Sequence, residues 1–154
     1  MGPHATREHP TLGTVRWDPE AGGWQCYVEL RPGLRISIAA IVEESWAEFE
    51  PDALITLIAD YVQWARQAEP ECMRAMIDQM FVDYDTTWAA DDPGDGYERL
   101  DREAFAGQIK LLGITLYHPG AADWIYDPAD LFGGLSIALW LDENRTIRDA
   151  TLFG

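Results

Sequence analysis

The last third of the chain, residues 109–154, constrains the fold more than any other stretch. It contains four short runs, each closed by a turn signal: IKLLGITLYH, ADWIYD, LSIALWLD and TIRDATLFG. The connections between these runs are too short for crossover helices, so the runs predict an antiparallel sheet. The aliphatic wall expected to hold the core consists of Ile109, Leu112, Ile114, Leu116, Leu135, Ile137, Leu139 and Leu141.

The N-terminal part predicts three more strands. Apolar and polar residues alternate in LGTVRWD, WQCYVEL and LRISIAAI, and the segments PEAGG and Pro32-Gly33 between them have the residues of tight turns. Connections this short predict a three-stranded meander. We expect residues 1–11 to be a disordered lead-in and residues 12–154 to form a single domain.

In the middle of the chain the apolar period changes from two to 3.6. One apolar stripe runs from Leu54 to Ala68 and a second from Met73 to Tyr84, and Pro70 between them is expected to begin a second helix. A short third helix is expected at DREAFAGQ, after a loop at residues 86–97. The sequence therefore predicts an α+β fold: an antiparallel sheet of the N-terminal meander and the C-terminal strands, packed against two or three central helices.

The net charge of −16 at neutral pH is concentrated in the middle of the chain. Residues 43–103 hold seventeen acidic and four basic side chains, whereas residues 1–42 hold four of each. A field of this sign repels nucleic acid and anionic lipid and favours basic partners, although a surface that is acidic only for solubility is the alternative. The chain has neither a long apolar run nor a secretory signal, which predicts a cytoplasmic protein without a membrane span.

The residues that usually bind metals or act as nucleophiles are few and scattered. Cys26 and Cys72 have no paired spacing, so they are expected to be reduced thiols that pack as small apolar residues. His118 follows a predicted strand next to Pro119-Gly120, a position more typical of a turn residue than of a general base. We therefore expect no cofactor.

Two acidic motifs resemble metal sites. Asp83-Tyr84-Asp85 has the D-x-D pattern of many glycosyltransferases, but it follows a segment of helical period rather than a strand of a parallel sheet. Residues 91–96 resemble a calcium loop, in which Pro93 would stand at position three and Arg102 at position twelve, where a glutamate is needed. Neither motif predicts a specific metal site.

Three stretches resemble the bacterial domain-of-unknown-function family 2262. They are LGTVRWD…GGWQCYVEL, the L-D-R-E-A-F helix that leads into a strand, and DLFGGLSIALWLDENRTIRDATLFG. The last is similar to the family's D-L-F-x-G-H-S-I and terminal A-x-I-x-G patterns, over residues 130–137 and 150–154. Leu135 stands where a histidine is common, so any role of that histidine is absent here. The resemblance implies a small α+β bacterial cytoplasmic protein and carries no accepted activity.

The clustered negative charge favours a binding module, such as an immunity or inhibitor protein that neutralises a basic protein partner, for example a toxin. Aromatic anchors for such a surface are expected at Trp46, Trp64 and Trp88. The candidate partner-binding residues are Asp78, Asp83, Asp85, Trp88, Asp91, Asp92 and Asp95. One alternative is an enzyme of unknown type with a carboxylate pair near Asp123, Asp127 and Asp130. Another is a structural domain without catalytic activity.

Overall fold

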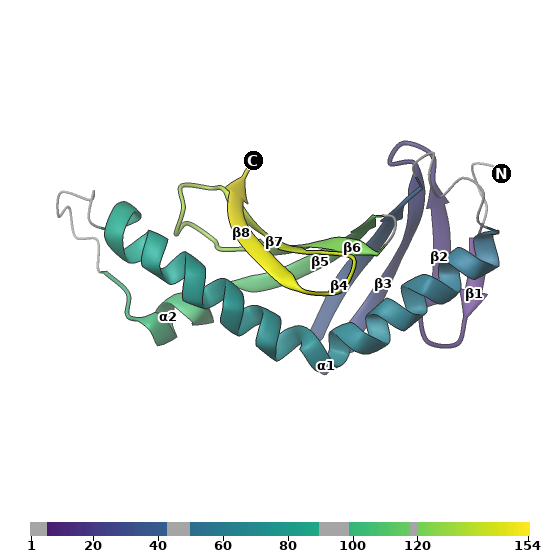
Figure 1. Cartoon of the computed structure of the whole chain (residues 1–154), viewed down its shortest axis with the longest axis horizontal. Helices are drawn as coiled ribbons and strands as arrows, with labels where there is room; N and C mark the ends of the chain where they lie inside the picture. Colours follow the sequence, from purple (N-terminus) through teal and green to yellow (C-terminus); the bar gives the residue numbers. More distant parts are fainter. Residues whose placement is uncertain (1–5, 43–49, 90–98, 118–119) are drawn as a thin grey trace.

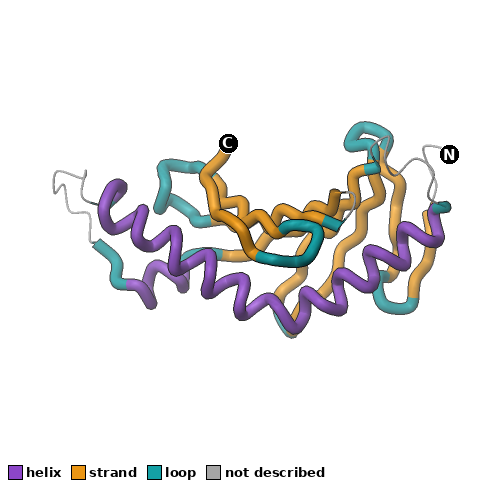
Figure 2. The backbone as a smooth tube through the Cα atoms, in the orientation of Figure 1, coloured by secondary structure: helices purple, strands orange, loops and turns teal. Residues whose placement is uncertain are grey.

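The computed structural model describes residues 6–42, 50–89, 99–117 and 120–154. Its strands form one eight-stranded sheet, and a long helix crosses the sheet from end to end (Figures 1 and 2). The strands lie in the sheet in chain order: β1 Thr6–His9, β2 Gly13–Asp18, β3 Gly23–Arg31, β4 Leu34–Ile41, β5 Lys110–Tyr117, β6 Ala121–Asp127, β7 Ser136–Leu141 and β8 Ile147–Phe153. The expected α+β fold is confirmed.

The sheet is mixed rather than purely antiparallel. The predicted meander β2–β4 and the C-terminal strands β5–β8 are each antiparallel, but β4 and β5 pair in parallel, with Ser37 opposite Gly113. The chain leaves β4 and returns to β5 through the helices, and a crossover of this length permits a parallel pair. A Cβ atom on Gly113 would lie 2.8 Å from the carbonyl oxygen of Ser37, so this junction requires a glycine.

The sheet begins earlier than the sequence indicated. Strand β1 pairs with β2 in antiparallel register, from Thr6 opposite Arg16 to His9 opposite Gly13. The expectation of a disordered lead-in is therefore wrong for residues 6–9, and residues 1–5 lie outside the described residues. The side chains of β1 are mostly exposed, so the strand is held by backbone pairing and leaves no apolar alternation for the sequence to show.

The two expected central helices are one helix, α1, from Pro51 to Asp83. Pro70 lies inside it, and α1 bends near its middle (Figure 1). A proline removes one helical hydrogen bond and usually bends a helix, but here the apolar residues on both sides pack on the same core and keep the helix continuous. The helix goes on as one π-helical turn, Tyr84–Trp88, where the sequence predicted a loop from residue 86. Within the described residues, no helix is long and apolar enough to cross a membrane.

The short helix α2, Arg102–Gly107, begins as expected. The side chain of Asp101 accepts a hydrogen bond of 2.8 Å from the backbone N–H of Ala104, which is the geometry of a helix N-cap. Phe105 of α2 is fully buried and joins an aromatic cluster with Tyr84 and Phe132. This cluster closes the core at the end of α1.

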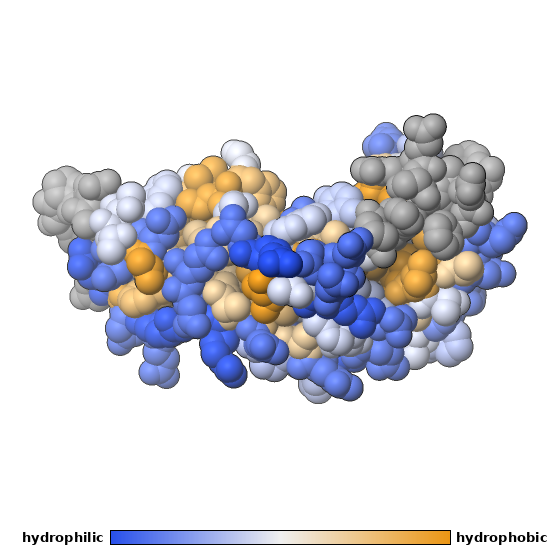
Figure 3. Space-filling view, in the orientation of Figure 1, coloured by the Kyte–Doolittle hydropathy of each residue, from blue (hydrophilic) through white to orange (hydrophobic). Residues whose placement is uncertain are grey.

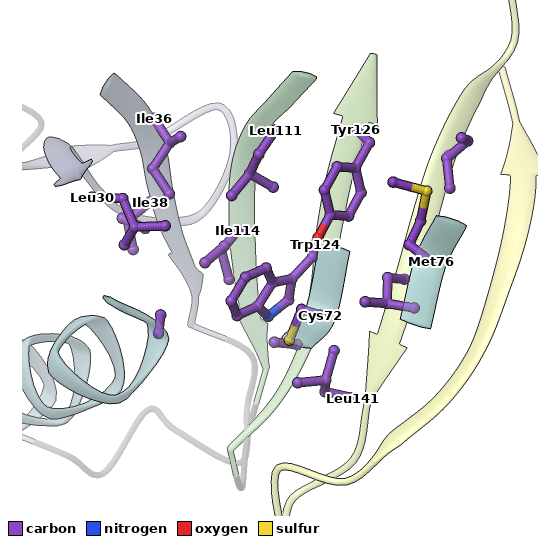
Figure 4. Packing of buried hydrophobic residues seen from close by; sticks show 14 of the residues in the cluster. Leu30, Ile36, Ile38, Cys72, Met76, Leu111, Ile114, Trp124, Tyr126 and Leu141 are labelled. Carbon is purple, nitrogen blue, oxygen red and sulfur yellow. The ribbon is translucent and has the colours of Figure 1, made fainter. Parts of the chain in front are cut away.

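The core lies between α1 and one face of the sheet. Cys72 and Met76 of α1 lie over Trp124 and Tyr126 of β6 (Figure 4). The indole N–H of Trp124 donates a buried hydrogen bond of 3.0 Å to the hydroxyl of Tyr61. Both expected free thiols are confirmed as buried, and burial raises the pKa of Cys72 to about 12.

One member of the expected aliphatic wall lies outside the core. The pairing of β5 with β6 shifts between Leu111 and Gly113, which is a β-bulge. Because an extra residue reverses the alternation of side chains, Leu111 is buried and Leu112 is 43% exposed. Strict alternation counted backwards from Ile114 placed Leu112 on the inner face.

The second face of the sheet lies opposite to α1. Along β6 and β7 the residues between the buried ones are half-buried or exposed, and within the described residues no helix covers them. In the space-filling view, the upper outline of the molecule is hollowed between the C-terminal strands and the N-terminal hairpins (Figure 3). We call the sheet surface opposite to α1 the open face.

Candidate functional site

A carboxylate and two aromatic rings meet on the open face of the C-terminal strands. Asp123 of β6 lies directly opposite Trp140 of β7, and the hydroxyl of Tyr117 on β5 lies 3.3 Å from Oδ2 of Asp123. The ring centroids of Tyr117 and Trp140 are 6.1 Å apart. We call these three residues the Asp123 site. They come from three neighbouring strands, so the sheet register fixes their relative positions.

Two hollows adjoin this site. One, of about 560 Å³, is lined by Thr115, Tyr117, Asp123, Ile125, Ala138, Thr151 and Phe153. The other, of about 440 Å³, is lined by Tyr117, Ala121, Trp140, Asp142, Glu143, Asn144 and Arg148. Tyr117 contributes to both, and Trp140 is 37% exposed. The site therefore has accessible space on each side of the tyrosine ring.

Partial burial makes the charged form of Asp123 less favourable than it is for an exposed aspartate. Partial burial raises the pKa of this carboxyl above its ordinary value of 3.8, and the hydrogen bond from Tyr117 opposes that shift in part. A carboxylate that is half-desolvated and has one protein donor keeps capacity for a further donor. A cationic ligand would supply that donor and would also lie against the two rings.

The neighbouring carboxylate of Asp142 is hydrogen-bonded to residues that follow it in the chain. It accepts hydrogen bonds from the backbone N–H groups of Asn144 and Thr146 and from Nε of Arg148, at 2.9, 3.0 and 2.6 Å. The hydrogen bond from Thr146 is the main cause that lowers the pKa of Asp142. Asp142 therefore stabilises the β7–β8 turn, whereas Asp123 faces the hollow.

Two of the three described aspartates of the predicted acidic surface lie next to arginines. Asp78 forms an ion pair with Arg102, and Asp85 lies 3.5 Å from Arg99. Asp83 is exposed and forms no ion pair with a described residue. The three aspartates thus lie on the same helical segment, and of the three only Asp83 has no arginine next to it among the described residues.

The remaining candidates of that surface differ in their exposure, and four of the residues are not described. Trp88 is 36% exposed and packs its ring against Phe132, with centroids 5.6 Å apart. Trp64 is partly buried and packs against the core, with its ring next to Tyr61 and Trp124. Outside the described residues lie Trp46, Asp91, Asp92 and Asp95.

Sequence reasoning missed Trp140 as a surface aromatic. The run LSIALWLD alternates, with Ile137, Leu139 and Leu141 buried, so the same pattern assigns Trp140 to the opposite face. That signal was present in the sequence. The pairing of Trp140 with Asp123 was not, because it depends on the register between β6 and β7.

Two of the three carboxylates named for the alternative of an enzyme lie on β6. Asp123 and Asp127 are four residues apart on one strand, which separates their Cα atoms by about 13 Å. Asp127 accepts a hydrogen bond from the N–H of Ala129, and Asp130 is exposed in the turn that follows.

The two acidic motifs show no metal geometry in the described part of the chain. Asp83-Tyr84-Asp85 lies on the helical segment, as its period indicated, and the middle residue Tyr84 is buried. The calcium-like loop and His118 lie outside the described residues. No group of three or more His, Cys, Asp or Glu side chains in the described ranges could hold a metal ion.

The comparisons with known proteins identify a family but no activity. The family described as "Uncharacterized protein conserved in bacteria" matches residues 9–152. No curated protein and no solved structure matches the chain. The match includes the meander, the helices and the C-terminal strands that carry the Asp123 site. The chain therefore belongs to the bacterial domain-of-unknown-function family 2262.

Proposed function

We propose that this protein is a binding module that holds a basic segment of a partner protein on the open face of its sheet. Its Asp123 site receives a lysine or arginine side chain of that segment. The observation that carries the proposal is the half-buried Asp123 carboxylate, which lines an accessible hollow together with Tyr117. Trp140 lies opposite Asp123 in the sheet and lines the adjoining hollow with Tyr117. A carboxylate with two aromatic rings is a chemical match for an organic cation.

The charge of the whole chain supports a cationic partner. A net charge of −16 attracts a basic protein from a distance and repels nucleic acid. Such steering acts mainly on the association rate, which is expected to fall as salt shortens the Debye length from about 30 Å at 0.01 M to about 8 Å at 0.15 M. An immunity or inhibitor protein that neutralises a basic toxin is one class with these requirements.

The Asp123 site suits an anchor better than the acidic surface of α1 does. Asp78 and Asp85 already have arginine partners, so a cationic ligand would have to displace Arg102 and Arg99. Exposed ion pairs contribute only about 0–1 kcal/mol, and exchanging one for another gains little. The aromatic rings at Asp123 add contacts that an exposed aspartate does not have.

A calorimetric titration with a capped lysine-rich peptide tests the proposal. Asp123→Asn is expected to weaken binding about tenfold or more, because it removes a charge-assisted hydrogen bond. Trp140→Ala is also expected to weaken it. Asp83→Asn is the matched control, since it removes one exposed negative charge from α1 and is expected to change the affinity by less than about twofold.

Two outcomes would contradict the proposal. An equal loss in Asp123→Asn and Asp83→Asn would mean that the peptide responds only to the overall charge. Unchanged binding in Trp140→Ala and Asp123→Asn together would place the contact elsewhere on the molecule.

A further inference from the structure

A separate hollow lies on the open face near the N-terminal edge of the sheet. It has a volume of about 680 Å³, which is within the range of roughly 300–1,000 Å³ typical of small-molecule sites. Strands β2, β3 and β4 and the turn before β2 supply its lining: Leu12, Gly13, Thr14, Arg16, Gln25, Cys26, Tyr27 and Arg35. We call it the Arg16 hollow. The Asp123 site has no residue in common with it.

The arginines of this hollow differ from most others in the chain. Six of the eleven basic side chains form ion pairs with carboxylates: Arg7, Arg31, Arg99, Arg102, Arg145 and Arg148. Arg16 and Arg35 form none with a described carboxylate, although the chain has an excess of acids. Two such arginines line one hollow. That arrangement leaves two guanidinium groups available to a ligand.

Two carboxylates on β1 and β3 are engaged by other donors. Glu29 lies opposite Arg35 in the β3–β4 register, yet its Oε1 accepts from the backbone N–H of Gly33 at 3.1 Å. At the rim, Glu8 accepts a hydrogen bond of 2.7 Å from the hydroxyl of Thr14. Neither acid therefore neutralises an arginine of the hollow by direct contact.

The register places polar groups between the two arginines. Arg16 on β2 lies opposite Gln25 on β3. The residue opposite Gln25 on β4 comes four positions after Arg35 in that strand. The Cα atoms of the two arginines therefore lie about 16 Å apart across the sheet. Tyr27 lies between them and is 61% exposed, with the guanidinium of Arg35 5.7 Å from its ring centroid. The two arginines therefore reach the hollow from strands on opposite sides of β3.

We propose that the Arg16 hollow binds a small molecule that carries at least two carboxylate or phosphate groups. A guanidinium donates two parallel hydrogen bonds to either group, so each arginine can hold one end of the ligand. Gln25 and Thr14 offer hydrogen bonds to its middle, and Tyr27 offers a flat apolar surface. The net charge of −16 repels anions at long range, so this pair of cations must act locally. The inference is independent of the proposed binding of a basic partner.

The test is isothermal calorimetry of the whole chain with citrate and with pyrophosphate. At least one of the two is expected to bind saturably with one site per chain. Arg16→Gln and Arg35→Gln are each expected to weaken it about tenfold or more, since each removes charge-assisted hydrogen bonds. Arg16→Lys keeps the charge but loses the forked geometry and should fall between the parent and Arg16→Gln.

Arg74→Gln is the matched control, because it makes the same change in net charge at an exposed position on α1. Its affinity for the probe is expected to equal that of the parent. An equal loss in Arg74→Gln would reduce the effect to overall charge and overturn the proposal. The absence of saturable binding for both probes below a Kd of about 1 mM would overturn it as well. Melting temperatures of the variants close to that of the parent show that each variant is folded.

Discussion

Gln79 of α1 holds the edge strand β8 in place, and its replacement is the sharpest test of the packing. Its Nε2 donates to the carbonyl oxygen of Ala150 and to Oδ1 of Asp149, both at 2.8 Å, and its Oε1 accepts from the N–H of Ala150 at 3.1 Å. A single side chain therefore satisfies both backbone groups of a buried residue on an edge strand, which would otherwise be open to pairing with another chain.

Replacing Gln79 with alanine is expected to cost about 2 kcal/mol of unfolding free energy. The carbonyl of Ala150 loses its side-chain partner at a buried position, which costs about 1–2 kcal/mol. The N–H of Ala150 still donates a hydrogen bond of 3.0 Å to the carboxylate of Asp149, so the loss of its bond to Gln79 costs less free energy. The bond between Gln79 and Asp149 is exposed and adds little. In a domain of this size, about 2 kcal/mol corresponds to a fall of roughly 4–8 °C in melting temperature.

Thermal and urea unfolding followed by circular dichroism measure this effect. Gln67→Ala, at an exposed position of the same helix, is the control and is expected to change the free energy of unfolding by less than about 0.5 kcal/mol. Gln79→Glu keeps an acceptor for the N–H of Ala150 but cannot donate to its carbonyl and adds a charge near Asp149. It should therefore destabilise at least as much as Gln79→Ala. A Gln79→Ala protein that melts within about 1 °C of the parent would mean that these hydrogen bonds do not hold β8 in place.

Three further predictions concern the core and the open face. Because burial raises the pKa of Asp123, its carboxylate destabilises the folded state above that pKa. Asp123→Asn should therefore raise the melting temperature at pH 7, and this gain should shrink as the pH falls towards 3.8, the ordinary value for aspartate. Gly113→Ala should destabilise by about 1–3 kcal/mol in urea unfolding, since its methyl group would collide with Ser37 at the β4–β5 junction. The buried hydroxyl of Tyr126 has no hydrogen-bond partner among the described residues, so Tyr126→Phe should melt at the same temperature as the parent or higher.

The sequence predicted the elements that bury an alternating or helical apolar face. The β2–β4 meander, the C-terminal strands and the Asp101 cap of α2 all follow from local patterns. It failed where tertiary packing overrides a local rule. Pro70 reads locally as a helix start, but core contacts on both sides keep α1 continuous, and the bulge before Gly113 exchanges the faces of Leu111 and Leu112.

The sites were less predictable than the fold. The acidic candidates on α1 were chosen by charge alone, whereas their neutralisation depends on ion pairs such as Arg102 with Asp78, which are 24 residues apart. The Asp123 site and the Arg16 hollow both arise from strand register, which brings together residues of different strands. Neither arrangement leaves a motif in the linear sequence.

The position at which a cation binds decides whether the Asp123 site is the anchor for a basic partner. Chemical-shift mapping by NMR, with a capped lysine-rich peptide added to the ¹⁵N-labelled chain, reports that position residue by residue. If the cation binds at Asp123, the indole N–H of Trp140 and the amides around Asp123 are expected to shift most and to saturate together. Shifts centred instead on Asp78, Asp83 and Asp85 of the helical segment, with those of Trp140 and Asp123 unmoved, would contradict it.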